Sequence, residues 1–401
     1  MQKGFDKNAS RLQRQKFMKF VRAFLFIALA ILPASAQDFK TVRDGVEYAQ
    51  FARSIKSSEK GTVQTATVSA LRLDLKKTRL DVVHALDAAI GVETTSSIAR
   101  RYSAFAAINA GFFRLDRSIF NGEATGVLQI DGKLLSESYS NRIAFLISNR
   151  GNETIIDFAH FDINDLVEIK NKTIKFSGIN RQRKDDEIIE FTPEFHRTTL
   201  TDNNGLEIIV RKEKIAAINN GKGGSLIPAD GYVISVGEKM REQLLPVLKI
   251  GNKVKLLSRI SYESNEFPAS IDDKTRVPVS TAEDIVGGVP QLIKNGKIEI
   301  TWEQEKSSKS FVETRHPRTA IGKLKNGRAL LVTVDGRSET SAGMSLQELA
   351  EMLLEMGATD AMNLDGGGST TMFLDGKVVN KPSDKEGERP VSDAILVTLR
   401  K

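Results

Sequence analysis

Most of this 401-residue chain alternates short runs rich in β-branched residues with turn residues. This punctuation is typical of strands joined by tight turns. Two segments, QLIKNGKIEI (291–300) and FLDGKVVN (373–380), contain Asn-Gly or Asp-Gly, the strongest short-range signal of a β-hairpin. We therefore predict an α+β fold that is built on a β-rich mixed sheet and has few helices.

One helix is strongly indicated, in the segment SLQELAEMLLEMG. Leu346, Leu349, Ala350 and Leu353 recur at helical spacing and would form one apolar face. Ser345 and Glu348 fit a capping box, and the glycine at position 357 is placed to end the helix. We expect a capped helix over about 345–356, packed before the strand that follows it.

The first 36 residues have the layout of a secretory signal peptide. Up to Arg22 there are seven Lys and Arg residues and one Asp, followed by the uncharged stretch AFLFIALAILPASA. The stretch ends in a small-x-small pattern, which predicts cleavage after Ala36. It is short for a transmembrane helix, so we expect no stable membrane insertion after cleavage and a periplasmic or secreted protein. The alternative is an uncleaved N-terminal anchor.

Net charge and cysteine content exclude some classes of function for this chain. The formal net charge of the chain is +7, and the leader contributes +6 of it, so the remaining chain is close to neutral at about +1. A nucleic-acid partner is not expected, because that class of protein needs a basic surface. The chain has no cysteine, which excludes disulfides, thiolate metal sites and thiol nucleophiles.

The stretch AMNLDGGGSTTMFLDG (361–376) places an acid, three glycines and hydroxyl residues between two apolar runs. Consecutive glycines permit backbone conformations that other residues resist, so successive N–H groups can converge on an anion. Ser369 and Thr370 would add hydroxyl donors. A Walker-type loop is excluded, because GxxxxGK[ST] is absent and the next segment resembles a strand. A plain tight turn with a structural acid is the alternative.

Several further motifs place polar residues at expected strand ends. They are AINAGFF (107–113), RHPRTAIG (315–322), VDGRSETSAGMS (334–345) and GERPVSDAILV (387–397). Together with NLDGGGSTTM (363–372) and IVGGVPQLIKNGK (285–297), they resemble the phosphodiester glycosidase family over about residues 100–401. The resemblance implies a hydrolase that cleaves a glycosyl-phosphodiester bond at the anomeric carbon of a sugar. Together with the leader, it predicts an exported enzyme that acts on an envelope or extracellular glycopolymer.

The resemblance also implies roles for individual residues. Asp365 is the first candidate for a catalytic carboxylate and Asp335 the second, although either could instead cap its own turn. His316 could protonate a leaving group or bind phosphate, or could simply be a packed histidine. The expected phosphate and substrate contacts are Arg315, Arg318, Arg337, Gly366, Gly367, Gly368, Ser369 and Thr370, with Asn109 binding a sugar hydroxyl or holding the glycine loop.

We expect three segments: the signal peptide (1–36), a β-rich N-terminal segment (37–100) and a phosphodiester glycosidase domain (101–401). No metal site is predicted; Asp-rich turns could hold Ca²⁺, but no EF-hand spacing supports it. Two other functions stay open. One is a glycosidase acting on an envelope polysaccharide without phosphate, and the other is a non-catalytic exopolysaccharide binding or assembly factor.

Overall fold

The computed structural model describes residues 38–56, 63–262 and 277–400, and within them β-strands dominate. The expected signal peptide lies outside the described residues. Sheet I has eight strands in the order β1 (Lys40–Arg43), β2 (Val46–Lys56), β3 (Val63–Leu73), β22 (Ala329–Val334), β21 (Arg318–Leu324), β23 (Ala358–Asn363), β19 (Gln291–Lys294) and β20 (Lys297–Ile298). Sheet II has five strands in the order β25 (Lys377–Val378), β24 (Met372–Leu374), β6 (Ala106–Asn109), β27 (Asp393–Leu399) and β4 (Thr78–His84).

Two more large sheets complete the β structure. Sheet III runs β11 (Lys172–Lys175), β10 (Glu153–Ile169), β9 (Ile143–Arg150), β18 (Asp284–Gly287), β7 (Leu128–Ile130) and β8 (Lys133–Ser136), with β17 (Val254–Tyr262) also on β10. Sheet IV runs β12 (Gly178–Ile179), β13 (Ile188–Phe191), β16 (Gly231–Val236), β14 (Leu206–Arg211) and β15 (Lys214–Asn220). A two-stranded ribbon pairs β26 (Pro390–Val391) with β5 (Glu93–Thr94).

The described helices are short: α2 (Thr95–Arg101), α3 (Glu238–Leu244), α4 (Lys309–Glu313) and α5 (Leu346–Glu355), with 3₁₀ turns η1 (Ala85–Asp87), η2 (Leu245–Val247), η3 (Val279–Thr281) and η4 (Gly367–Ser369). The predicted β-rich α+β class is confirmed, and so is the capped helix, which is α5. Its capping box between Ser345 and Glu348 is formed in both directions. The four residues of its predicted apolar face are fully buried against sheet I, in a cluster with residues such as Val332.

The two predicted hairpins also form, between β19 and β20 and between β24 and β25. In each turn both central residues have positive φ, at 50° and 72° for Asn295-Gly296 and at 47° and 85° for Asp375-Gly376. This is the backbone of a type I′ turn, which matches the twist of the flanking strands. The Asn-Gly and Asp-Gly signals therefore reported real local structure.

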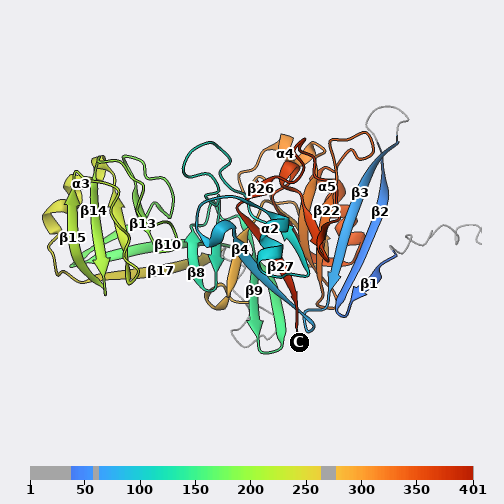
Figure 1. Ribbon diagram of the computed structural model, residues 1–401, viewed down its shortest axis with the longest axis horizontal. Coiled ribbons are helices and arrows are strands. Elements are labelled where there is room, and N and C mark those ends of the chain that lie inside the picture. The colour runs from blue at the N-terminus through green and yellow to red at the C-terminus, as the bar shows by residue number, and fades with distance from the viewer. Residues whose placement is uncertain (1–37, 57–62, 263–276, 401) are drawn as a thin grey trace, which may run out of the picture. The chain divides into compact units, whose positions relative to one another are not determined.

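Strands from the first hundred residues are built into the sheets of the later chain. β3 pairs with β22 along six residue pairs, and β4 pairs with β27 along seven. Figure 1 shows the blue strand β3 beside the red strand β22. The described part of 39–401 forms one compact unit, and strands from both sides of residue 100 share sheets I and II. The expected division at residue 100 stays a prediction.

The main core lies where sheets I, II and III face one another. It contains Leu71, Ile108, Phe145, Ile321 and Ile395, each at most 1% exposed. Burying side chains of this size contributes roughly 1.5–3 kcal/mol each. A rigid core therefore lies directly beneath the strand ends that carry the polar motifs.

Candidate functional site

The predicted motifs meet at one edge of sheets I and II. β21 and β22 are antiparallel, with Arg318 opposite Val334, so the start of β21 lies beside the end of β22. The end of β23 joins them, because Asn363 is opposite Ala320. From there the chain crosses to β24 in sheet II through residues 364–371. We call residues 365–371 the glycine loop.

Asn109 fastens this loop to both sheets. Its Nδ2 donates to the carbonyl oxygen of Asp365 at 2.7 Å, and its Oδ1 accepts from Thr319 Oγ1 at 2.8 Å and from the Thr371 N–H at 3.1 Å. The side chain is fully buried. Of the two roles expected for Asn109, the geometry supports holding the loop, because both polar ends of the amide already have protein partners.

Glycine is required in the loop for two different reasons. Gly367 has φ +62°, a conformation that side chains with a Cβ rarely adopt. At Gly368 a Cβ would lie 2.2 Å from Nη2 of Arg389, so a larger residue would displace the arginine or the loop. The glycines thus let the backbone approach its neighbours closely.

The loop amides differ from the expected cluster of anion-binding N–H groups. The Gly366 N–H donates to Asp365 Oδ1 at 3.0 Å, and the Gly367 N–H donates to the carbonyl oxygen of Pro317 at 2.9 Å. Both amides are therefore satisfied within the protein. Donors for a bound anion must come mainly from side chains.

Three consecutive hydroxyls supply such donors. Among the described residues, Ser369 Oγ, Thr370 Oγ1 and Thr371 Oγ1 are buried and have no hydrogen-bond partner. Leaving a buried hydroxyl unpaired costs about 1–3 kcal/mol. Three in a row therefore mark a place where a polar ligand or water completes the bonding. The sequence predicted Ser369 and Thr370 in this role, and Thr371 follows them directly in the same motif.

Asp365 is half-buried at the entrance of this loop. Burial raises the pKa of Asp365 to about 6, and the Gly366 N–H and the charge of Arg389 only partly oppose this rise. Among the groups that oppose this rise in pKa, Ser369 Oγ has the largest effect, although its geometry falls short of a hydrogen bond. Asp365 is thus mainly ionised at neutral pH, as a nucleophile must be, and can accept a proton near that pH, as a general base must.

A second carboxyl group next to Asp365 is Asp393, which opens β27 and is 1% exposed. It accepts from the Gly111 N–H at 2.5 Å and from Ser392 Oγ at 2.6 Å. Burial raises the pKa of Asp393, and its charge in turn raises the pKa of Asp365. Asp393 was not among the predicted site residues, although it stands inside the motif GERPVSDAILV. An acid directly before a predicted strand was the available signal.

Asp335 is more heavily engaged by the protein. Its Oδ1 accepts from the Lys381 N–H at 3.0 Å and from Asn380 Nδ2 at 3.3 Å. Burial raises the pKa of Asp335, and these two donors oppose the rise. These bonds tie the end of β22 to the segment after β25, which favours a structural role. Its predicted part in catalysis stays a prediction.

The predicted arginines fall into two groups. Arg337 lies against the glycine loop, since a Cβ at Gly367 would be 3.0 Å from its Nη2. It is exposed, and no hydrogen bond or ion pair joins it to the described residues. Arg389 also borders the loop but is paired with Asp384 at 2.7 Å. Arg337 is therefore the guanidinium with open donors beside the loop.

Arg315 and Arg318 are occupied by protein groups. Arg315 binds Glu348 at 2.5 Å, the carbonyl oxygen of Lys56 at 2.7 Å, and Gln64. Arg318 is 1% exposed and donates to the carbonyl oxygens of Met344, Phe311 and Thr314 at 2.8–2.9 Å. Burial lowers the pKa of Arg318 to about 10. These contacts favour a structural role for both arginines, and their predicted phosphate contacts stay predictions.

His316 lies at the same edge, where its backbone pairs with Met344. Burial and the nearby charges of Arg318 and Arg337 lower the pKa of His316. The imidazole is therefore neutral at neutral pH. It can bind a ligand there but would not carry a positive charge to a phosphate.

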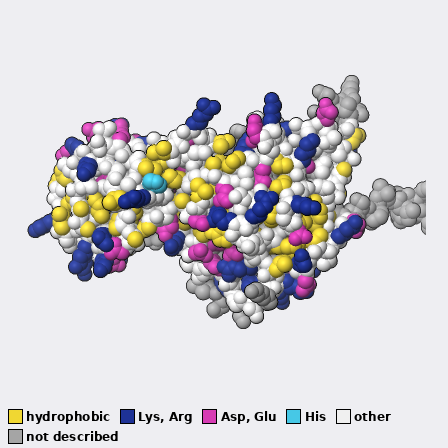
Figure 2. All heavy atoms as spheres, in the orientation of Figure 1, with side chains coloured by type: hydrophobic (Ala, Val, Ile, Leu, Met, Phe, Trp, Pro, Cys, Tyr) yellow, Lys and Arg dark blue, Asp and Glu magenta, His cyan; other side chains and the backbone are white. Residues whose placement is uncertain are grey.

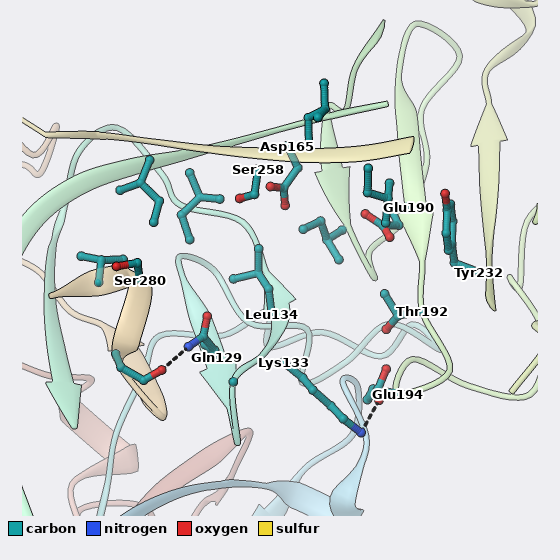
Figure 3. A pocket seen from close by; sticks show the side chains of 18 of the residues that line it. Gln129, Lys133, Leu134, Asp165, Glu190, Thr192, Glu194, Tyr232, Ser258 and Ser280 are labelled. Carbon is teal, nitrogen blue, oxygen red and sulfur yellow. Dashed lines mark hydrogen bonds and ion pairs between the residues drawn. The ribbon is translucent and has the colours of Figure 1, made fainter. Parts of the chain in front are cut away.

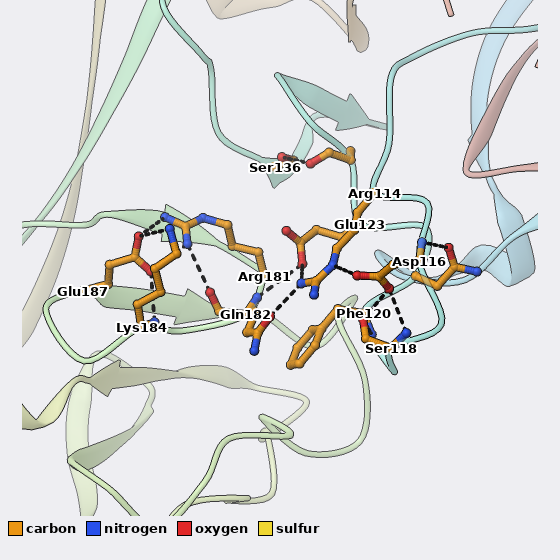
Figure 4. Close-up of polar contacts among 12 residues, drawn as sticks. Arg114, Asp116, Ser118, Phe120, Glu123, Ser136, Arg181, Gln182, Lys184 and Glu187 are labelled. Carbon is orange, nitrogen blue, oxygen red and sulfur yellow. Dashed lines mark hydrogen bonds and ion pairs between the residues drawn. The ribbon is translucent and has the colours of Figure 1, made fainter. Parts of the chain in front are cut away.

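Glu123, in the turn NGEATG, belongs to a different polar network, shown in Figure 4. Its Oε2 accepts from the Gln182 N–H at 3.3 Å and lies 3.7 Å from Nη1 of Arg114. Arg181 in the same view pairs with Glu187 at 2.8 Å. These contacts join loops of the chain, so they favour the turn placement over a catalytic one.

Comparison with known proteins locates the family signal in the same part of the chain. A model of the phosphodiester glycosidase family matches residues 204–398. The N-acetylglucosamine-1-phosphodiester alpha-N-acetylglucosaminidase of Mus musculus is 37% identical over 116 residues, which are 27% of this chain and 22% of that protein. Its Homo sapiens counterpart is 39% identical over 109 residues, 25% and 21% of the two chains. The chain spans about a fifth of the length of these relatives.

Solved structures show the same fold over a longer stretch. A hypothetical protein from Synechocystis has a TM-score of 0.72 at 24% identity, covering 92% of this chain and 65% of that one. A protein of Burkholderia pseudomallei has a TM-score of 0.71 at 23% identity, covering 83% and 74%. Likeness at these identities concerns the fold alone.

Proposed function

We propose that the chain hydrolyses a glycosyl-phosphodiester bond at the anomeric carbon of a sugar, from the premise that the phosphodiester glycosidase family model matches residues 204–398. The observation that carries the proposal is the presence of two different functional groups at the glycine loop. One is the half-buried Asp365 with its raised pKa, and the other is the unpaired Arg337 beside Gly367. A carboxylate and a free guanidinium suit a substrate that joins an electrophilic carbon to a phosphate.

In the proposed arrangement, Arg337 and the unpaired hydroxyls of Ser369, Thr370 and Thr371 hold the phosphate. Negative charge grows on the phosphate as the glycosidic C–O bond breaks, and these donors stabilise it. The departing phosphate monoester leaves readily, so a strong leaving-group acid is less necessary than in ordinary glycosidases. Asp365 acts at the anomeric carbon, as nucleophile or as the base that activates water. Asp393 holds the Ala110–Gly111 backbone beside it.

The proposed substrate is a phosphate-linked glycan of the cell envelope or its surroundings, reached by export through the predicted leader. In the described residues no helix is long and apolar enough to span a membrane. On the face drawn in Figure 2, Lys and Arg side chains are interspersed with Asp and Glu. This mixed surface supports a sugar substrate better than a nucleic acid, which selects clustered positive charge.

Kinetics with two substrates test the proposal. Arg337→Ala should cost about 2–4 kcal/mol in kcat/KM for a sugar phosphodiester, the scale of one lost charge-stabilising donor. For an aryl glycoside without phosphate the same change should cost little. Arg211→Ala, an exposed arginine on β14 that pairs with Asp230, is the matched control and should change neither value.

The companion variant is Asp365→Asn, which keeps the size of the side chain and removes its charge. It should lower kcat roughly 10⁴-fold or more if Asp365 is the nucleophile, while phosphate binding persists. Equal losses for Arg337→Ala on both substrates would favour a glycosidase that does not recognise phosphate. Unchanged turnover by Asp365→Asn would favour a binding or assembly factor, or another catalytic acid.

A further inference from the structure

A cavity of about 600 Å³ lies away from the glycine loop, where strands of sheets III and IV face each other. Its lining comes from the β7–β8 hairpin, β10 and β17 on one side and from β13 and β16 on the other. Figure 3 shows Asp165, Ser258 and Glu190 around this space. The size is in the range of small-molecule sites. We call it the inter-sheet cavity.

Glu190 is the feature of this cavity that most requires explanation. Glu190 is more than nine-tenths buried, with 7% of its surface exposed. Its carboxyl group makes no hydrogen bond or ion pair with the described residues. An unpaired buried acid costs free energy that a folded protein normally avoids by providing a partner.

Asp165 on β10 adds a second carboxyl group to the same cavity. Its Oδ1 is buried without a hydrogen-bond partner among the described residues. Burial raises the pKa of Glu190 to about 8, with the charge of Asp165 as the second cause, and burial also raises the pKa of Asp165. The two carboxyl groups are therefore expected to keep one proton when no cation is bound, because the charge of Asp165 disfavours ionisation of Glu190.

Within the described part of the chain, no free cation lines the cavity to balance these acids. Of the described residues that line the cavity, Lys133 alone carries a positive charge, and it pairs with Glu194 at 2.8 Å. Figure 3 draws this pair apart from Asp165 and Glu190. The remaining wall combines the polar side chains of Gln129, Thr192, Ser258 and Ser280 with apolar ones, among them Leu134, Ile163, Ile179, Leu256, Ile260 and Val279.

We propose that the inter-sheet cavity binds a ligand with one ammonium group on an apolar body, the ammonium lying between Asp165 and Glu190. The charge of such a ligand matches the unbalanced acids, and its apolar part matches the walls. A neutral sugar would satisfy the carboxyl groups less well, since it brings no charge to offset their burial. The proposal does not rest on the glycosidase activity, because the cavity is built from other strands.

Calorimetric titration of the full chain with n-pentylammonium tests this, with neutral 1-pentanol as the matched probe. We expect saturable binding of the amine and at least tenfold weaker binding of the alcohol. Glu190→Gln and Asp165→Asn should each weaken amine binding at least tenfold. Glu168→Gln is the control, because Glu168 is three residues from Asp165 on β10 and so faces the opposite side of the strand.

A second readout separates an electrostatic site from a merely apolar one. Titrations at pH 7 in buffers of different ionisation heat should show that amine binding releases a proton, since the carboxyl pair gives up its shared proton. The groups facing the pair are Tyr232 on β16, Ser258 on β17 and the Lys133–Glu194 pair, and none of them is expected to titrate between pH 6 and 9. Affinity should therefore rise from pH 6 to pH 9.

Three results would overturn the proposal. They are an absence of saturable amine binding, equal binding of the amine and the alcohol, and amine binding that folded Glu190→Gln and Asp165→Asn both leave unchanged. Binding of glucose in preference to the amine would also contradict it. Circular dichroism of each variant confirms that a loss of binding does not reflect a loss of fold.

Discussion

At the scale of single residues, the site depends on which polar groups the protein has already satisfied. The three predicted arginines looked equivalent in the sequence, and the structure separates them by their partners. Arg318 donates to three carbonyl oxygens, whereas Arg337 donates to none of the described residues. Sequence spacing places a guanidinium at a strand end but cannot reveal what surrounds it, so this distinction was not predictable.

The pKa of Asp365 gives a prediction for the pH dependence of activity. The reactive form is the carboxylate, and its pKa in the folded protein is about 6. kcat/KM for a sugar phosphodiester should therefore be level above pH 7 and fall about tenfold per pH unit below 6. Initial rates at low substrate concentration from pH 4.5 to 8.5 measure this.

His316 could imitate that acid limb, because its own pKa is lowered from 6.5. His316→Gln is therefore the control and should keep the fall below pH 6. If the limb disappears in this variant, the titrating group is the histidine and the assignment to Asp365 is wrong.

Arg318→Ala is predicted to act on stability more than on substrate choice. The change empties a fully buried position and leaves three carbonyl oxygens without their donor. Unfolding free energy should drop by about 3–5 kcal/mol, the range for breaking a buried charged network. Thermal melting measures the drop, and any residual activity should fall equally on substrates with and without phosphate. A phosphate-specific loss with unchanged melting would restore Arg318 as a phosphate ligand.

At the scale of elements, local signals predicted well and long-range contacts did not. Helix α5 and the two type I′ hairpins formed where capping residues, helical spacing and Asn-Gly or Asp-Gly pairs indicated them. The pairing of β3 with β22 brings together segments that are more than 250 residues apart in the chain. No local sequence pattern predicts this pairing. The glycine loop was correctly placed after a buried strand, but its amides bind Asp365 and Pro317 instead of remaining open.

The loop conformation can be tested with Gly367→Val. A β-branched residue resists φ +62°, and its Cβ would lie 3.0 Å from Arg337 Nη2, so the loop and the arginine must both shift. Activity should fall at least about 100-fold, the cost of misplacing catalytic groups, while circular dichroism stays native. Gly376→Val is the matched control: it has φ +85° but open space around its Cβ. Equal effects of the two changes would mean that backbone strain alone, and not the site, explains the loss.

At the scale of the whole molecule, export is the prediction that the described residues leave open. The leader pattern predicts that the mature protein begins at Gln37. N-terminal sequencing of protein recovered from the envelope or medium checks this. A mature protein that still contains the segment 24–33 would instead indicate an anchor in the membrane.

The hydrogen bonds of Asn109 bear on when the candidate site can form during synthesis of the chain. One buried amide holds segments around 109, 319, 365 and 371, and beside it β27 inserts between β6 and β4. Synthesis runs from the N-terminus, so the site cannot assemble until residue 399 has left the ribosome. Nucleotide-activated sugars in the cytoplasm also carry a bond between the anomeric carbon and a phosphate oxygen. Under the proposed activity, a chain that is exported before it folds never meets them in a competent form, and the cell's own sugar donors are spared.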